Sequence, residues 1–144
     1  MNTHLTLAHM QDKGLRITKV RRALIQLFSE HSIPYTANQI EKKLFAIGIL
    51  VNKTTIYREL QFLSQNGYIT EVYLHSNEIS YESAELKHHH HLVCESCGNV
   101  DDVINCLVSE LNREIYQKKK FKIRTHTLEF YGTCAKCAHI KHIK

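Results

Sequence analysis

Four of the five cysteines in this chain of 144 residues form two Cys-x-x-Cys pairs. The first pair is Cys94 and Cys97, in "CESCGN", and the second is Cys134 and Cys137, in "CAKCAH". Each pair can chelate an ion from a tight turn, and four thiolates complete the tetrahedral coordination that structural Zn²⁺ prefers. We therefore predict a structural zinc site with no open position for a substrate. The fifth cysteine, Cys106, lies among apolar neighbours in "VINCLV" and is predicted to be a buried thiol.

Four consecutive histidines, His88 to His91, run into the first of these cysteines. If "HHHHLVC" forms a strand, successive side chains face opposite sides of the sheet. His88 and His90 then point one way and the other two histidines the other way, which suits two metal ions rather than one. Mixed imidazole and carboxylate ligation suits Fe²⁺, Mn²⁺, Zn²⁺ or Ni²⁺. The residues that could complete these sites are Glu82, Asp101, Asp102, Glu110 and His126.

The composition favours a soluble protein of one ordinary domain or two small ones, with 43% hydrophobic residues. No apolar run approaches the roughly 18 residues of a membrane span. The first residues show no charged-then-apolar leader, so we expect a cytoplasmic protein without membrane association. Thiols stay reduced in that compartment, where paired cysteines more often bind metal than form disulfides.

Charge and metal-binding residue types are divided unevenly along the chain. Residues 1–75 carry nine Lys and Arg against five Asp and Glu, while residues 76–144 carry ten against nine. The excess positive charge of the first half favours a polyanion as partner, although a merely basic surface is the alternative. All five cysteines and seven of the eleven histidines lie in the second half. Two halves with different chemistry predict two small domains.

The first half contains three segments with apolar residues at helical spacing, each preceded by an N-cap residue. The caps are Thr18, Thr36 and Asn52, and Gln39 adds a capping box to the second. The alternating segments "YITEVYL" and "EISYE" follow, around the polar turn "HSN" at residues 75–77. Three helices followed by a β-hairpin is the order of a winged helix-turn-helix.

In that fold the N-terminal part of the third helix enters the major groove of DNA. The residues there combine hydroxyls, an aromatic ring and cations: Asn52, Lys53, Thr54, Thr55, Tyr57 and Arg58. A solvated helix face with Tyr57 in the core is the alternative. A run of cations precedes or opens the first of the three helices and could reach the DNA backbone or a minor groove, unless it is only solvated: Lys13, Arg16, Lys19, Arg21 and Arg22.

Four motifs follow one another along the chain: "GLRITKVR", "TTIYRELQFLSQNGYI", "HHHHLVCESCGNV" and "LEFYGTCAKC". In these motifs and their order the chain resembles, over nearly its whole length, the ferric uptake regulator family of metal-sensing repressors. The resemblance implies an α+β protein: a winged helix-turn-helix DNA-binding domain over residues 1–84 and an α/β dimerisation domain over residues 85–144. It also implies a homodimer that binds palindromic double-stranded operator DNA when loaded with a regulatory metal.

The resemblance also implies roles for individual residues. Structural zinc corresponds to the four paired cysteines. A hinge sensing site between the domains corresponds to Glu82, His89, His91 and Asp102. A second site, inside the dimerisation domain, corresponds to His88, His90 and His126, with Glu110 next to the aligned position. Tyr57 and Arg58 correspond to the recognition-helix pair, and Arg16 to a basic residue that approaches a minor groove.

Three positions depart from the family pattern. Pro34 stands where the hinge site often takes a histidine, with only His31 nearby. His90 replaces a frequent aspartate, and Ser109 a frequent glutamate. The nitrogen-rich set favours zinc over iron as the sensed metal, although the order of affinities does not by itself decide metal choice.

We therefore expect a metal-responsive repressor of iron or zinc homeostasis genes, with peroxide, manganese or nickel sensing as alternatives within the family. A zinc-dependent hydrolase is a remote alternative. The chain has no H-E-x-x-H motif, nucleophile elbow or phosphate loop, so no enzyme activity and no small-molecule substrate are expected. A metal-storage or protein-interaction module would leave "NKTTIYREL" and the basic first half without a role.

Overall fold

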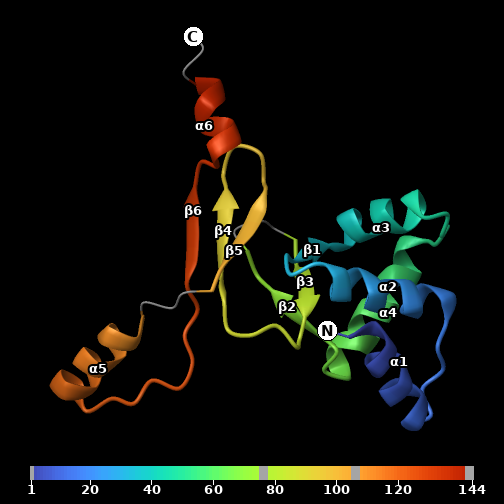
Figure 1. Ribbon diagram of the computed structural model, residues 1–144, viewed down its shortest axis with the longest axis horizontal. Coiled ribbons are helices and arrows are strands. Elements are labelled where there is room, and N and C mark those ends of the chain that lie inside the picture. The colour runs from blue at the N-terminus through green and yellow to red at the C-terminus, as the bar shows by residue number, and fades with distance from the viewer. Residues whose placement is uncertain (1, 75–77, 105–107, 142–144) are drawn as a thin grey trace. The chain divides into compact units, whose positions relative to one another are not determined.

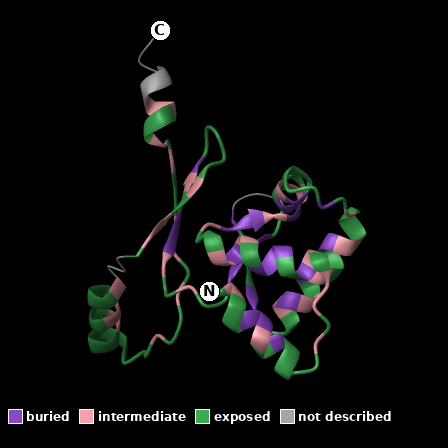
Figure 2. Cartoon of the chain, turned by 45° about the vertical axis from the view of Figure 1, so that its right-hand side comes forward, coloured by how far each residue is buried: buried purple, intermediate pink, exposed green. Residues whose placement is uncertain are grey.

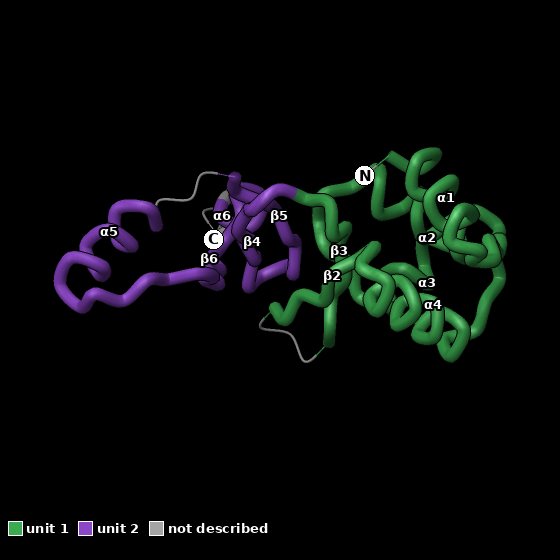
Figure 3. The backbone as a smooth tube through the Cα atoms, turned by 90° about the horizontal axis from the view of Figure 1, so that it is seen from below, with its two compact units in different colours: residues 1–86 green, residues 87–144 purple. Residues whose placement is uncertain are grey.

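The computed structural model describes residues 2–74, 78–104 and 108–141, with side chains as far as Ala138. The chain divides into two compact units, Met1–Leu86 and Lys87–Lys144, shown in separate colours in Figure 3. The predicted turn at residues 75–77 and the predicted buried thiol of Cys106 lie outside the described residues. None of the helices in the described ranges is both long and apolar enough to cross a membrane.

The first unit combines helices with a small antiparallel sheet, whose strand order is β1-β3-β2 (Figure 1). Its elements in chain order are α1 (Thr3–Asp12), α2 (Lys19–Glu30), β1 (Tyr35–Thr36), α3 (Ala37–Ala46), α4 (Lys53–Gln65), β2 (Ile69–Val72) and β3 (Ser80–Ser83). Helices α2, α3 and α4 followed by the β2–β3 pair confirm the predicted winged-helix order. Helix α1 is an addition to the three predicted helices.

Side-chain caps start the three predicted helices where the sequence placed them. The Arg21 N–H donates to Thr18 Oγ1 at 3.1 Å, and the Thr55 N–H donates to Asn52 Oδ1 at 2.8 Å. Thr36 and Gln39 form the reciprocal capping box of α3. Each cap satisfies a backbone donor that the first helical turn cannot bond internally. Local sequence alone therefore fixes where these helices begin.

One hydrophobic core holds the first unit together, and it lies where the helices meet the sheet (Figure 2). The side chains that are almost completely buried come from all four helices and from β2: Met10, Leu24, Ile25, Phe28, Ile40, Leu44, Ile56, Leu60, Leu63 and Ile69. In α3 and α4 these residues recur every three or four positions, which produces the apolar face that packs inward. This core fixes α4 with its opposite face exposed.

In its described residues, the second unit contains a three-stranded mixed sheet of order β5-β4-β6 and two helices. Its elements are β4 (His90–Cys94), β5 (Val100–Val103), α5 (Val108–Lys119), β6 (Glu129–Gly132) and α6 (Ala135–Lys141). Strand β4 pairs antiparallel with β5 and parallel with β6. A parallel pair needs a long connection, and the chain through β5 and α5 supplies it. Helix α5 has no buried residue.

Candidate metal centres and DNA-contacting surface

The two cysteine pairs meet at one end of the sheet of the second unit. Cys94 ends β4, and Cys97 follows in a turn closed by the Gly98 N–H, which donates to the Cys94 carbonyl at 2.8 Å. Gly98 has a φ of +70°, a conformation that glycine adopts without strain. Cys134 immediately precedes α6, and Cys137 lies in its first turn. The predicted second turn is thus the start of a helix, where residues three apart share one face.

The sulfur positions fit a zinc ion. The Sγ atoms of the four paired cysteines all lie within 4.8 Å of one another, and those of Cys97 and Cys134 are 3.8 Å apart. Zn–S bonds of about 2.3 Å in a tetrahedron place neighbouring sulfurs about 3.8 Å apart. A disulfide would require about 2.05 Å. The cluster is therefore compatible with a structural zinc site.

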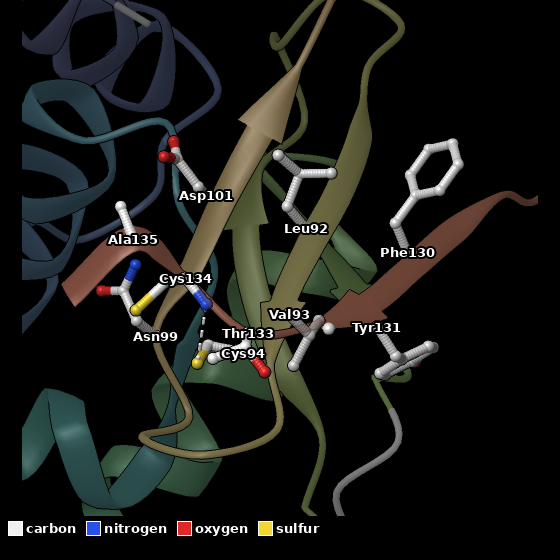
Figure 4. A pocket seen from close by; sticks show the side chains of 11 residues that line it. Leu92, Val93, Cys94, Asn99, Asp101, Phe130, Tyr131, Thr133, Cys134 and Ala135 are labelled. Carbon is white, nitrogen blue, oxygen red and sulfur yellow. Dashed lines mark hydrogen bonds between the residues drawn. The ribbon is translucent and has the colours of Figure 1, made fainter. Parts of the chain in front are cut away.

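Hydrogen bonds within the cluster separate the acidities of its thiols. The Cys134 N–H donates to Cys94 Sγ at 3.3 Å (Figure 4), and this bond together with that of the Cys97 N–H lowers the pKa of Cys94 to about 6. Hydrogen bonds to the Cys97 and Cys134 sulfurs, together with burial, raise the pKa of Cys137 to about 12. Several adjacent thiolates are stable together only near a cation, which a bound divalent metal supplies.

A pocket of about 370 Å³ lies beside the cysteines, on the sheet. Figure 4 shows its lining, in which Cys94 and Cys134 lie close together and the side chains of Leu92 and Phe130 extend from β4 and β6. These two residues are register partners in the parallel pair, and their side chains are 39% and 46% exposed. The single chain therefore leaves an apolar part of this sheet open to solvent.

His88, His90 and His126 form the second cluster, although His126 lies 38 residues beyond His88. The Nε2 atoms of His88 and His126 are 3.1 Å apart. Two neutral imidazoles at this distance can share one proton, or both can bind one ion. Zn–N bonds of about 2.0–2.1 Å in a tetrahedron give a separation of about 3.3 Å, so the distance fits either interpretation.

The environment of His90 favours a bound ion over a shared proton in this cluster. The residue is 2% exposed, and its Nε2 has no hydrogen-bond partner among the described residues. Burial, together with the neighbouring His88 and His126, lowers its pKa, against a hydrogen bond with the backbone of Leu128. An imidazole held through one ring nitrogen by backbone, with the other nitrogen buried and unpaired, is the arrangement of a metal ligand. Buried polar atoms without any partner are otherwise rare.

His89 and His91 face each other in a separate pair. Their Nε2 atoms are 3.2 Å apart, and Nδ1 of His89 lies 2.8 Å from the Lys87 carbonyl oxygen. As with His90, a backbone group bonds to one ring nitrogen of His89, and its Nε2 faces the neighbouring histidine. Asp102 stands opposite His91 in the β4–β5 register, and Glu82 is buried on β3 of the first unit.

The structure does not bring every predicted ligand into a cluster. Glu110 is exposed on α5 and is not among the atoms grouped with the three histidines. Asp102 is likewise outside the groups of three or more donors found in the described residues. Its backbone N–H donates to Asp101 Oδ1 at 2.9 Å, a bond that does not involve the Asp102 carboxylate.

The candidate DNA-contacting face lies on α4. Tyr57 is 51% exposed, and Arg58, Lys53 and Thr54 are also exposed. The alternative of Tyr57 in the core is therefore wrong. Asn52 Oδ1 is engaged by the helix cap. Beyond these residues, Arg16 is exposed in the segment between α1 and α2.

Two features of this region were not predicted from the sequence. Lys53 donates to Asn38 Oδ1 at 2.9 Å, and Asn38 Nδ2 donates to Glu78 Oε1 at 2.7 Å. Arg21, grouped with the solvent-exposed cations, is only 9% exposed and pairs with Glu59 at 2.8 Å. A local sequence pattern cannot predict these contacts, because the partners lie 15 to 40 residues apart in the chain.

Comparisons with known proteins agree with this arrangement. The model of the family described as "Ferric uptake regulator family" matches residues 12–131. The ferric uptake regulation protein of Neisseria meningitidis serogroup B is 30% identical over 132 residues, covering 91% of this chain and 92% of that protein.

Solved structures show the same fold. The Helicobacter pylori ferric uptake regulator, described as having three functional metal-binding sites, has a TM-score of 0.81 at 19% identity, covering 96% of this chain and 95% of that one. The Francisella tularensis regulator, solved with iron, has a TM-score of 0.74 at 23% identity and covers 87% and 96%.

Proposed function

The chain belongs to the ferric uptake regulator family of metal-responsive transcription regulators, and we propose that it is a repressor that binds operator DNA as a homodimer when a regulatory divalent cation is bound. The observation that carries the metal dependence is His90, whose buried Nε2 lacks a hydrogen-bond partner among the described residues and lies with two other imidazoles. The cytoplasm is the compartment that this role requires.

The four paired cysteines hold a structural zinc ion in this proposal. They fill all four positions of a tetrahedron, so no open position remains for a substrate or a reacting water. Their task is to join the end of β4 to the start of α6. The family's members are transcription regulators, and we propose accordingly that this chain is not an enzyme.

Glu82, His89, His91 and Asp102 are the proposed hinge sensing site. Glu82 belongs to the first unit, and the other three belong to the second. A cation held by all four would restrict the hinge and favour the arrangement that binds DNA. The coupling must be reciprocal, so operator DNA should strengthen binding of the cation. Equal cation affinities with and without operator would contradict this mechanism.

The metal identity follows from the donor atoms. His88, His90 and His126 supply three imidazole nitrogens, and no carboxylate is grouped with them in the described residues. Imidazole suits zinc, copper, iron and nickel, whereas carboxylate and water suit manganese and magnesium. We propose that this second site prefers zinc to manganese, with Fe²⁺ or Ni²⁺ as possible occupants. Peroxide sensing requires bound Fe²⁺ and is the second candidate function within the family.

Two features support DNA and a second copy of the chain as partners. The excess positive charge lies in the half of the chain that carries α4, with Lys53, Tyr57 and Arg58 on its exposed face. The second unit exposes apolar side chains on α5 and the sheet, including Leu111 at 52% and Phe130 at 46%. Such surfaces are covered in oligomers. A dimer would place two recognition helices for two operator half-sites.

The direct test is a DNA-binding titration of zinc-loaded protein with added Fe²⁺, Zn²⁺, Mn²⁺ or Ni²⁺. The probe is a DNA duplex selected from a random-sequence library by the metal-loaded protein. We expect tight binding only when a regulatory ion is added, at a free concentration near that of the cell. Selection of no specific duplex under any of these ions would contradict the proposed function.

The matched variant is Tyr57→Ala with Arg58→Ala. Both residues are exposed, so the change should leave folding and zinc content intact while lowering affinity for the selected duplex by more than about tenfold. Lys42→Ala, at an exposed residue of helix α3, is the control for a general loss of positive charge. Similar losses for both variants would show that binding is only electrostatic.

A further inference from the structure

Arg21 is a buried cation in the most basic part of the chain. Its side chain is about 10% exposed, and each side of its guanidinium has a different partner. The Nε–H donates to Glu59 Oε2 at 2.8 Å, and Nη1 donates to the Arg16 carbonyl oxygen at 2.7 Å. The guanidinium carbon also lies 3.6 Å from the centre of the Phe62 ring.

These contacts fasten three separate segments together. Arg21 lies on α2, Glu59 and Phe62 lie one turn apart on α4, and Arg16 lies in the segment between α1 and α2. A planar guanidinium can donate in two fixed directions and stack on a ring at the same time, which an ammonium group cannot do. Burial of such a charge is costly unless it is paired and hydrogen-bonded. The folded unit therefore favours the one arrangement in which Arg21 keeps these partners.

The segments that Arg21 joins both carry residues of the proposed DNA-contacting surface. Arg16 is exposed in the segment before α2, and Arg58, next to Glu59, is exposed on α4. We propose that Arg21 is a positioning residue for DNA recognition: it fixes the backbone at Arg16 relative to α4, so that both contact one operator half-site together. This inference rests on the proposed function.

Two physical effects follow from the geometry. The segment that carries Arg16 has no regular structure, although Leu15 and Ile17 on either side of it pack against the core. The bond to the Arg16 carbonyl restricts this backbone further, so less conformational entropy is lost on binding. Arg21 also neutralises Glu59, a carboxylate on the helix that faces the phosphates, and holds it inside the unit. Arg21 thus improves DNA binding without touching DNA.

The test is a double-mutant cycle on the full-length, zinc-loaded protein, with the selected duplex as probe. The background Arg21→Met with Glu59→Met removes both buried charges, retains apolar volume, and leaves the Arg16 carbonyl without its donor. Arg16→Ala is then made in the native chain and in this background, and duplex affinity is measured with zinc content and thermal unfolding. A role through Arg16 predicts that the two changes are not additive.

We expect Arg16→Ala to weaken duplex binding about tenfold in the native chain and less than about twofold in the background. An equal loss in both would overturn the inference, since Arg21 would then be only structural. Glu59→Gln is the matched control: it keeps an acceptor for Arg21 and the bond to Arg16, so the tenfold loss should persist there.

Arg21→Lys provides a second, milder variant if the double substitution impairs folding. A lysine keeps the charge but cannot reach both acceptors in the same geometry. We expect duplex affinity to fall about fivefold with little change in thermal unfolding. Unchanged affinity would overturn the inference. Failure of the native protein to select a duplex would instead contradict the proposed function, so the two failures are distinguishable.

Discussion

The two units of this chain bury different kinds of side chain. The first unit buries aliphatic and aromatic residues from every helix, in one contiguous core. Among the described residues of the second unit, only His90, His91 and Cys94 are buried, and all three are types that bind metal. The first unit can therefore be stable through apolar burial, whereas we expect the second to depend on bound metal and on a covering partner.

This difference follows from size and composition. A small unit buries too little apolar surface to offset the conformational entropy lost on folding, and metal binding commonly supplies the missing free energy. The described part of the second unit places its large apolar side chains, such as Tyr116 and Phe121, largely in solvent. We therefore expect stability and metal binding to be linked in the second unit and separate in the first.

The largest expected effect is removal of the cysteine-bound zinc. Cys97→Ser changes an exposed side chain, so any loss reports on the ligand rather than on packing. Because metal binding is folding free energy in such sites, we expect the folded population of the second unit to fall by more than about 100-fold. Amide hydrogen exchange should show lost protection over residues 87–141 and retained protection over α2–α4.

Cys106→Ser is the control for this prediction. It changes the cysteine outside the two Cys-x-x-Cys pairs and should leave the cysteine-bound zinc in place. If the second unit of Cys97→Ser lacks zinc but keeps its amide protection, its stability does not depend on the metal. The proposed difference between the two units would then be wrong.

A core substitution should have the converse effect. Leu60 is fully buried on α4, and Leu60→Ala should destabilise the first unit by about 3 kcal/mol through lost contacts and a residual cavity. The urea midpoint of the first unit should fall while zinc stoichiometry is unchanged. Phe45→Ala, at a residue 68% exposed, should change stability by less than about 0.5 kcal/mol. Loss of zinc in Leu60→Ala would show that the units are not independent.

A change at His90 tests the proposed sensing role of the second unit. His90→Asn removes the ligand nitrogen while retaining a polar side chain, and should weaken binding of the second ion by more than about tenfold. The cysteine-bound zinc should remain. Competition with a chromophoric chelator measures the affinity of the second ion and the retention of the cysteine-bound zinc. His90→Asp is the matched variant: its oxygen donor should preserve binding and shift the preference toward manganese. Unaltered affinity in both would exclude His90 as a ligand.

The smallest predicted effect is local to the first unit. Thr36→Ala removes the capping box of α3 and should cost about 1 kcal/mol of stability. Thr36→Ser retains the hydroxyl and should cost much less. Thermal unfolding with two resolved transitions should show a shift in the first unit alone. A shift of the second transition as well would indicate that the two units unfold together.

Prediction from sequence succeeded where the physical rule is local. The caps Thr18, Thr36 and Asn52 each bond a donor three residues away, and a short pattern is enough to find them. Prediction failed where a distant partner decides the outcome. Arg21 resembles its exposed neighbours in sequence but is buried, because Glu59 lies 38 residues later and meets it only when α2 packs near α4.

The sequence by itself determined the chemistry of this protein: two cysteine pairs for a tetrahedral ion, and a histidine run that a strand divides between two faces because its period is two. Only the tertiary structure decided which residues join them. The parallel register of β4 and β6 pairs Cys94 with Gly132, so the following Cys134 N–H reaches the Cys94 sulfur. It also brings the segment with His126 to His88. Strand pairing across such separations depends on the whole fold, because no nearby residue specifies the register.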